Sequence, residues 1–217
     1  MLWNQDPGGL LITMTERARI PIVNVGYYST NYWVVSAGSS RLLVDLGYPG
    51  TMGMMRAGLD RMGVPLKEIQ YALATHYHTD HAGLAQELKR LGVALLVLEV
   101  QVRAIPLMRP WIKPRDRYVD ITTHDNVTVC FAETRTVLEG IGIAGEVVHT
   151  PGHSDDSVSL LLDDGSAFTG DLTPPALVRE EDAAVVAASW RLLRERGATR
   201  LYPGHGPVRL MDADQLV

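Results

Sequence analysis

His76-Tyr77-His78-Thr79-Asp80-His81 is the segment that most constrains the fold and the chemistry of this chain. Three imidazoles and a carboxylate this close together cannot all be buried without partners, because unpaired polar and charged groups are costly to remove from water. A metal ion would satisfy them, since a borderline divalent ion prefers neutral imidazole nitrogens and ionised carboxylates as ligands. The competing interpretation is a solvated polar loop that is rich in histidine.

The flanking residues place this segment between a strand and a helix. Upstream, residues 70–75 form an apolar run of strand length, and downstream Leu84, Leu88 and Leu91 have helical spacing. The histidines therefore follow the carboxyl end of a buried strand, which is where open α/β folds bind their ligands.

Short apolar runs separated by turn residues predict strands along the whole chain, and two longer periodic stretches predict further helices. The elements fall into two halves, each a run of strands followed by helices, and sheets covered by helices on their outer faces predict a four-layer α/β sandwich. The predicted strands are residues 10–14, 20–25, 32–36, 41–45, 70–75, 94–98, 127–131, 145–148, 157–162, 167–169 and 200–202, and the predicted helices are 51–62, 84–91 and 181–196.

Bulk composition limits the domain count and the partners. With 217 residues and 46% hydrophobic content, the chain can bury one sizeable core, so we expect a single domain over residues 1–217. The formal net charge of −5 speaks against nucleic acid as a partner, because nucleic acids favour basic surfaces. The one cysteine, Cys130, lies in an alternating pattern that predicts a thiol in the core of a strand.

Targeting signals are not evident. Residues 1–9 lack the basic stretch and the apolar stretch of a signal peptide, and no apolar run reaches the length of a membrane span. We therefore expect a cytoplasmic protein that acts on a small molecule and has no membrane partner. The oligomeric state stays open, a homodimer included.

Three later polar residues also follow predicted strands. They are His153 in Thr150-Pro-Gly-His153, Asp171 in Gly170-Asp171-Leu, and His205 in Pro203-Gly-His205-Gly. Because each one comes directly after a strand, we expect these residues to converge with the first cluster at one sheet edge.

Taken in order, these residues form the pattern H-x-H-x-D-H … H … D … H, which resembles that of the metallo-beta-lactamase superfamily from about Tyr32 to Pro207. The resemblance implies an α/β fold, namely a four-layer αββα sandwich of two mixed sheets flanked by helices. It also implies two metal ions. The first would be bound by His76, His78 and His153, the second by Asp80, His81 and His205, and Asp171 would bridge the two.

Asp45, in Asp45-Leu-Gly47, matches the family's Asp-x-Gly motif. The match implies that its carboxylate supports a metal-binding histidine from behind, because such histidines need an acceptor that sets their tautomer. The alternative is a plain turn residue. His149, four residues before His153, is predicted to be structural or to support a ligand in the same indirect way.

The activity implied by the resemblance is that of a dinuclear metal-dependent hydrolase. A metal-bridging hydroxide would cleave an ester-like bond, such as a lactone, ester or thioester, in a small molecule. Two zinc ions are the first choice, although iron and manganese suit the same ligands. Asp80 has a free oxygen, so we expect it also to act in catalysis by orienting the hydroxide and passing a proton to the leaving group.

Other activities of the same superfamily stay open. One alternative is a mononuclear iron dioxygenase that acts on persulfides, and another is a phosphodiesterase or nuclease of the same fold. Quorum-quenching lactonases place a carbonyl-polarising tyrosine three residues after the bridging aspartate, where this chain has Pro174. Because different loops select different substrates on one fold, the sequence leaves the substrate undetermined.

Two aromatic residues are candidates for a substrate pocket. Tyr28 lies in an aromatic-rich connection between early strands, and Trp111 lies in an insertion between the two metal-binding halves. Apolar walls with a few polar groups are typical of small-molecule pockets, but aromatic residues of this kind also serve simple packing.

Overall fold

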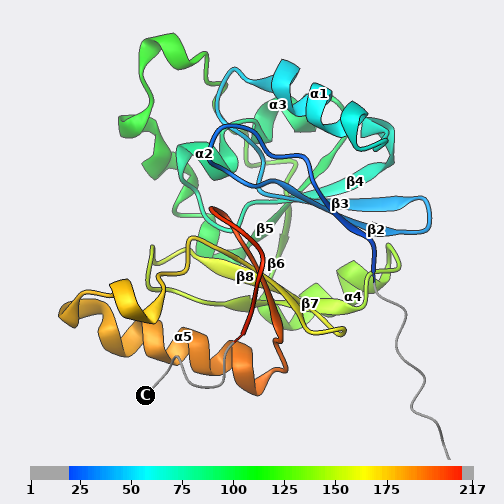
Figure 1. Ribbon diagram of the computed structural model, residues 1–217. Coiled ribbons are helices and arrows are strands. Elements are labelled where there is room, and N and C mark those ends of the chain that lie inside the picture. Colours follow the sequence, from blue (N-terminus) through cyan, green and yellow to red (C-terminus); the bar gives the residue numbers. More distant parts are fainter. Residues whose placement is uncertain (1–19, 212–217) are drawn as a thin grey trace, which may run out of the picture.

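Two mixed β-sheets stack face to face, and helices cover their outer faces (Figure 1). The structure, a computed structural model, describes residues 20–211. The predicted strand at residues 10–14 and the stretch inspected for a signal peptide lie outside the described residues. The four-layer sandwich of two mixed sheets flanked by helices, expected from the sequence, is confirmed.

The first sheet has six strands in the order β1-β2-β3-β4-β5-β6. The first three pair antiparallel, and β3 through β6 pair parallel, so the carboxyl ends of β3, β4 and β5 meet at one edge. The strands are β1 (Ile22–Asn24), β2 (Trp33–Ala37), β3 (Ser40–Val44), β4 (Ile69–Leu73), β5 (Ala94–Leu98) and β6 (Val127–Val129).

The second sheet has five strands in the order β11-β10-β9-β8-β7. Only β9 and β10 are parallel neighbours, so their carboxyl ends also point the same way. The strands are β7 (Gly145–His149), β8 (Val158–Leu162), β9 (Ser166–Gly170), β10 (Arg200–Pro203) and β11 (Arg209–Leu210). The sequence did not predict β11, because two exposed residues carry no alternating pattern.

The predicted helices are present and lie in the outer layers. In Figure 1, α1 (Met52–Arg61) and α3 (Ala85–Arg90) cover the first sheet, and α5 (Ala183–Glu195) covers the second. The short helix α2 (Thr79–Ala82) begins inside the histidine segment, and the unpredicted α4 (Thr134–Glu139) packs Leu138 between the sheets. Short 3-10 turns complete the chain: η1 (Leu66–Glu68), η2 (Glu99–Gln101), η3 (Ile105–Trp111), η4 (Pro114–Asp116), η5 (Phe131–Glu133), η6 (Pro175–Leu177) and η7 (Glu180–Asp182).

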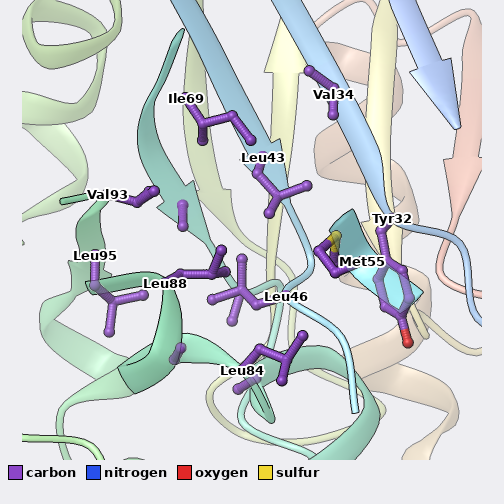
Figure 2. Close-up of a cluster of buried hydrophobic side chains, with 14 of the residues drawn as sticks. Tyr32, Val34, Leu43, Leu46, Met55, Ile69, Leu84, Leu88, Val93 and Leu95 are labelled. Carbon is purple, nitrogen blue, oxygen red and sulfur yellow. The ribbon is translucent and has the colours of Figure 1, made fainter. Parts of the chain in front are cut away.

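Three clusters of buried apolar side chains fill the three interfaces between the layers. Strand β5 shows how alternation builds them: Leu95 and Val97 pack toward the helices, whereas Leu96 and Leu98 pack toward the second sheet. Figure 2 shows the cluster under the helices, where Leu95 lies among side chains of the sheet and of α3. Both faces of the first sheet are therefore buried. Polar side chains without apolar neighbours are accommodated at the ends of its strands.

The strand predicted over residues 127–131 ends early. β6 stops at Val129, and the backbone N–H of Cys130 donates a hydrogen bond of 2.8 Å to the carboxylate of Glu133. A glutamate three residues ahead that reaches back to a backbone N–H starts a helical turn and replaces the strand pairing. The prediction that Cys130 is a strand-core thiol was wrong, since the residue is only partly buried.

Candidate metal centre

The seven side chains singled out from the sequence lie together where four strands end. His76 and His78 follow β4 of the first sheet, and α2 carries the next two residues of the segment. The other three follow β7, β9 and β10 of the second sheet. The expected convergence is therefore found, and it joins both sheets. The seven are His76, His78, Asp80, His81, His153, Asp171 and His205.

Three histidines form the first group. Nε2 of His153 lies 3.1 Å from Nδ1 of His78, and the ring centroids of His76 and His153 are 4.7 Å apart. One ring nitrogen of each of the three lies within 4.8 Å of the others, so the three could hold one metal ion.

Asp80, His81 and His205 form the second group. Oδ2 of Asp80 lies 3.3 Å from Nε2 of His205 and 3.5 Å from Nε2 of His81. These three ligand atoms also lie within 4.8 Å of one another.

Asp171 stands between the two groups. Its Oδ1 lies 3.3 Å from Nε2 of His81, and its Oδ2 lies 3.4 Å from Nε2 of His205 and 3.8 Å from Nε2 of His153. One carboxylate therefore faces histidines of both groups, which is the geometry that a bridging ligand needs.

Several polar atoms at the centre are buried without a hydrogen-bond partner among the described residues. They include Nε2 of His76, Nε2 of His81 and Oδ1 of Asp171. Buried polar atoms almost always have a partner, because leaving one unpaired costs about 1–3 kcal/mol. A borderline divalent ion would be the partner of such nitrogens and oxygens, so the residues present fit a metal site.

Burial and neighbouring charges shift the pKa values at the centre in different directions. Burial lowers the pKa of His76 well below its usual value, and the neighbouring histidines add to the effect. Burial would also lower the pKa of His81, but the carboxylates of Asp45 and Asp171 outweigh it and raise that pKa well above its usual value. Burial opposes the ionisation of Asp171, yet the nearby imidazole of His81 outweighs it and lowers the pKa of the carboxyl.

Asp45 lies behind His81. Its Oδ1 accepts hydrogen bonds of 2.8 Å from the backbone N–H and the hydroxyl of Thr75, and its Oδ2 lies 2.9 Å from Nδ1 of His81. The ring of His81 is thereby held with Nε2 toward Asp80 and Asp171. Asp45 is buried and has a φ of 63°, a left-handed conformation that costs about 1–3 kcal/mol and clusters at functional sites.

The connection between β1 and β2 orients His205, a role that the sequence did not predict. The backbone carbonyl of Ser29 accepts a hydrogen bond of 2.7 Å from Nδ1 of His205. The proton is then on Nδ1, and Nε2 is free to face Asp80 and Asp171. The hydroxyl of Thr30 donates to Oδ2 of Asp80 at 3.3 Å.

The same connection is tied to the loop that carries His205. The side-chain amide of Asn31 donates hydrogen bonds to the backbone carbonyls of Pro203, at 3.0 Å, and Gly206, at 2.8 Å. A side chain at Gly204 would place its Cβ 2.5 Å from Oδ1 of Asp171, so only glycine lets this loop approach the centre. No sequence pattern would have revealed these contacts, because most of them use backbone carbonyls.

The remaining candidates lie in three different places. His149 is not brought to the centre, since its Nε2 contacts the backbone carbonyl of Asp155 at 2.8 Å and its ring packs near Phe131. Tyr28 is exposed and packs edge-on against Tyr27. Trp111 lines a hollow together with His78 and Asp80, next to the centre.

Comparison with known proteins identifies the family of this chain and several relatives. The model of the family described as "Metallo-beta-lactamase superfamily" matches residues 25–205. A beta-lactamase-like protein 2 homolog of Caenorhabditis elegans is 28% identical over 182 residues, which cover 82% of this chain and 56% of that protein. An atrochrysone carboxyl ACP thioesterase of Aspergillus terreus is 27% identical and is covered over 50% of its length. The chain thus spans little more than half the length of these curated relatives.

A solved structure shows the same fold. A metallo-beta-lactamase family protein from Thermus thermophilus superimposes with a TM-score of 0.67 over 90% of this chain and 76% of that protein, at 22% sequence identity. None of the helices in residues 20–211 is long and apolar enough to cross a membrane.

Proposed function

Because this chain belongs to the metallo-beta-lactamase superfamily, we propose that it is a dinuclear metal-dependent hydrolase of small molecules that carry an ester-like bond. A thioester is the first candidate substrate, since one relative is named as a thioesterase. The observation that carries the proposal is the carboxylate of Asp171, which faces histidines of both groups. In this proposal His76, His78 and His153 hold one zinc ion, Asp80, His81 and His205 hold the other, and Asp171 bridges them.

The centre suits hydrolysis. Two bound ions would lower the pKa of water enough to supply a nucleophile at neutral pH and would polarise the carbonyl that is attacked. Asp80 lines the hollow beside Trp111, and its Oδ2 is held by the hydroxyl of Thr30. From this position the carboxylate can take the proton of the attacking water and give it to the sulfur or oxygen that leaves as the carbonyl bond breaks.

Metal content and turnover test the proposal together. Full-length protein purified without added metal should contain about two zinc ions per chain, measured by elemental analysis. It should hydrolyse short-chain thioesters or esters, lose this activity on treatment with a chelator, and regain it on addition of zinc. One iron per chain with oxygen uptake in the presence of a persulfide would replace the proposal with the dioxygenase alternative. Cleavage of phosphodiesters alone would replace it with the nuclease alternative.

The role of Asp80 is tested separately by Asp80→Asn. Asparagine keeps one oxygen as a possible ligand but cannot carry a proton, so kcat should fall by about two orders of magnitude or more. Metal content, measured in the same preparation, shows whether a lower kcat comes from the missing proton carrier or from a missing ion. Full turnover with both ions bound would remove the proton-transfer role.

A further inference from the structure

We propose that a cleft beside the metal centre binds the acyl part of the substrate, and that it selects an extended apolar chain without a negatively charged end. This inference rests on the proposed function and adds the substrate class. It is carried by residues 99–111, which form η2, a turn and η3 and line a hollow together with His78 and Asp80.

Residues 99–111 carry apolar side chains of two kinds, some buried in the core and some lining a cleft. Ile105 and Met108 are buried in the core under the helices. Four apolar side chains line the cleft: Val100 and Ala104 are partly buried against the core, whereas Leu107 and Trp111 are exposed. We call these four residues the cleft face. Leu107 is 67% exposed and Trp111 is 77% exposed, and neighbouring exposed apolar side chains of this size commonly mark a binding site.

The cleft face lines a cleft of about 700 Å³, which is within the range of small-molecule pockets. A smaller hollow of about 280 Å³ shares Tyr77, His78 and Trp111 with the cleft and reaches Asp80. A substrate whose carbonyl carbon lies at the centre can therefore extend its acyl chain past Trp111 toward Leu107.

The polar residues that line the cleft determine which groups the acyl chain of the substrate can carry. Glu99, Asp155 and Asp156 line it, and Arg103 is the one cation among the lining residues. Asp156 accepts hydrogen bonds from the backbone N–H of Tyr77 and from the hydroxyl of Ser154, both at 2.7 Å. The lining is negative on balance, and like charges brought together cost binding energy, so a carboxylate at the end of the chain is disfavoured.

Trp111 allows binding to be measured without turnover. Of the tryptophans in the described residues, Trp33 and Trp190 are buried, so a ligand in the cleft should change mainly the fluorescence of Trp111. The probes are straight-chain methyl ketones of four to ten carbons, which have a carbonyl but no leaving group, added to the full-length protein with its metal. Affinity should rise about two- to fourfold with each added methylene until the cleft is filled. A ketone with a carboxylate at its far end should bind more weakly than its neutral counterpart.

Matched variants locate the site. Leu107→Ser should remove most of the dependence on chain length, whereas Leu210→Ser should leave it unchanged, because Leu210 is 66% exposed on β11 and lies outside the cleft lining. Trp111→Phe should keep the affinity of long ketones and Trp111→Ala should lower it several-fold, both measured by calorimetry. Equal affinity for all chain lengths, or equal behaviour of the two serine variants, would overturn the inference.

Hydrolysis of thioesters with the same chain lengths, measured in parallel, separates the two proposals. Length-dependent ketone binding without any hydrolysis supports the cleft and contradicts only the proposed reaction. Hydrolysis that ignores chain length contradicts the cleft and leaves the reaction standing.

Discussion

Asp171→Ala is expected to lose about one metal ion per chain and to lower kcat/KM by roughly three orders of magnitude or more. Oδ1 of Asp171 faces His81, and its Oδ2 faces both His205 and His153, at 3.3–3.8 Å. Alanine has no oxygen to join the two groups. A bound ion contributes several kcal/mol to transition-state stabilisation, and each 1.36 kcal/mol is a factor of ten in rate, from which the roughly thousandfold loss follows. Elemental analysis and steady-state kinetics on the same preparation check both parts.

Asp120→Ala is the matched control for this prediction. The carboxylate of Asp120 is exposed, lies 3.4 Å from the guanidinium of Arg109 and belongs to neither metal-binding group. Exposed ion pairs contribute only about 0–1 kcal/mol, so this variant should keep its metal content and its turnover. If Asp171→Ala also retained two ions and full activity, the bridging role of Asp171 would be ruled out.

Asp45→Asn is expected to weaken metal binding about 10- to 100-fold while the protein stays folded. Asparagine tolerates the left-handed conformation at φ 63°, and its side-chain oxygen can still accept the two hydrogen bonds from Thr75. Its amide, however, would place a donor 2.9 Å from Nδ1 of His81, where the carboxylate oxygen now lies. The proton of the imidazole would then move to Nε2, the nitrogen that must be free to bind an ion.

Asp45→Ala separates this tautomer effect from a loss of packing. Alanine removes the acceptor for Thr75 and the charge beside His81, so the free energy of unfolding should fall by about 2–4 kcal/mol as well. Competition titration with a chelator measures the metal affinity, and chemical denaturation measures the stability. An asparagine variant that binds metal as tightly as the wild type would show that Asp45 is only a turn residue.

Much of the fold could be predicted because buried apolar residues recur in the sequence at the spacing of strands and helices. Strands such as β5, with Leu95 and Leu96 packing on opposite faces, have no solvent-facing side and appear as continuous apolar runs. The helices α1, α3 and α5 were predicted for the same reason, from apolar residues on one side. Elements whose formation depends on one local hydrogen bond were not: the turn at Cys130 ended a strand that the pattern alone would have continued.

The candidate site, like the fold, could be predicted only in part from the sequence. Its seven residues were found in the sequence because three imidazoles and a carboxylate lie within residues 76–81, and the three later residues complete the pattern of the superfamily. Their roles as ligands remain a prediction, as does the support of His81 by Asp45. The groups that orient the seven side chains could not be predicted from the sequence. Ser29, for example, acts through its backbone carbonyl, which any residue would offer.

By itself, the sequence determined which side chains are available for chemistry and that they follow the ends of buried strands, because residue type and periodicity are local properties. Only the tertiary structure decided how those side chains face one another. The position of Asp171 between the two groups, the hydrogen bonds of Asn31 to the His205 loop and the cleft lined by residues from Tyr77 to Asp156 join residues far apart in the chain. Such contacts depend on how two sheets pack together, and packing between distant segments leaves no pattern along a single sequence.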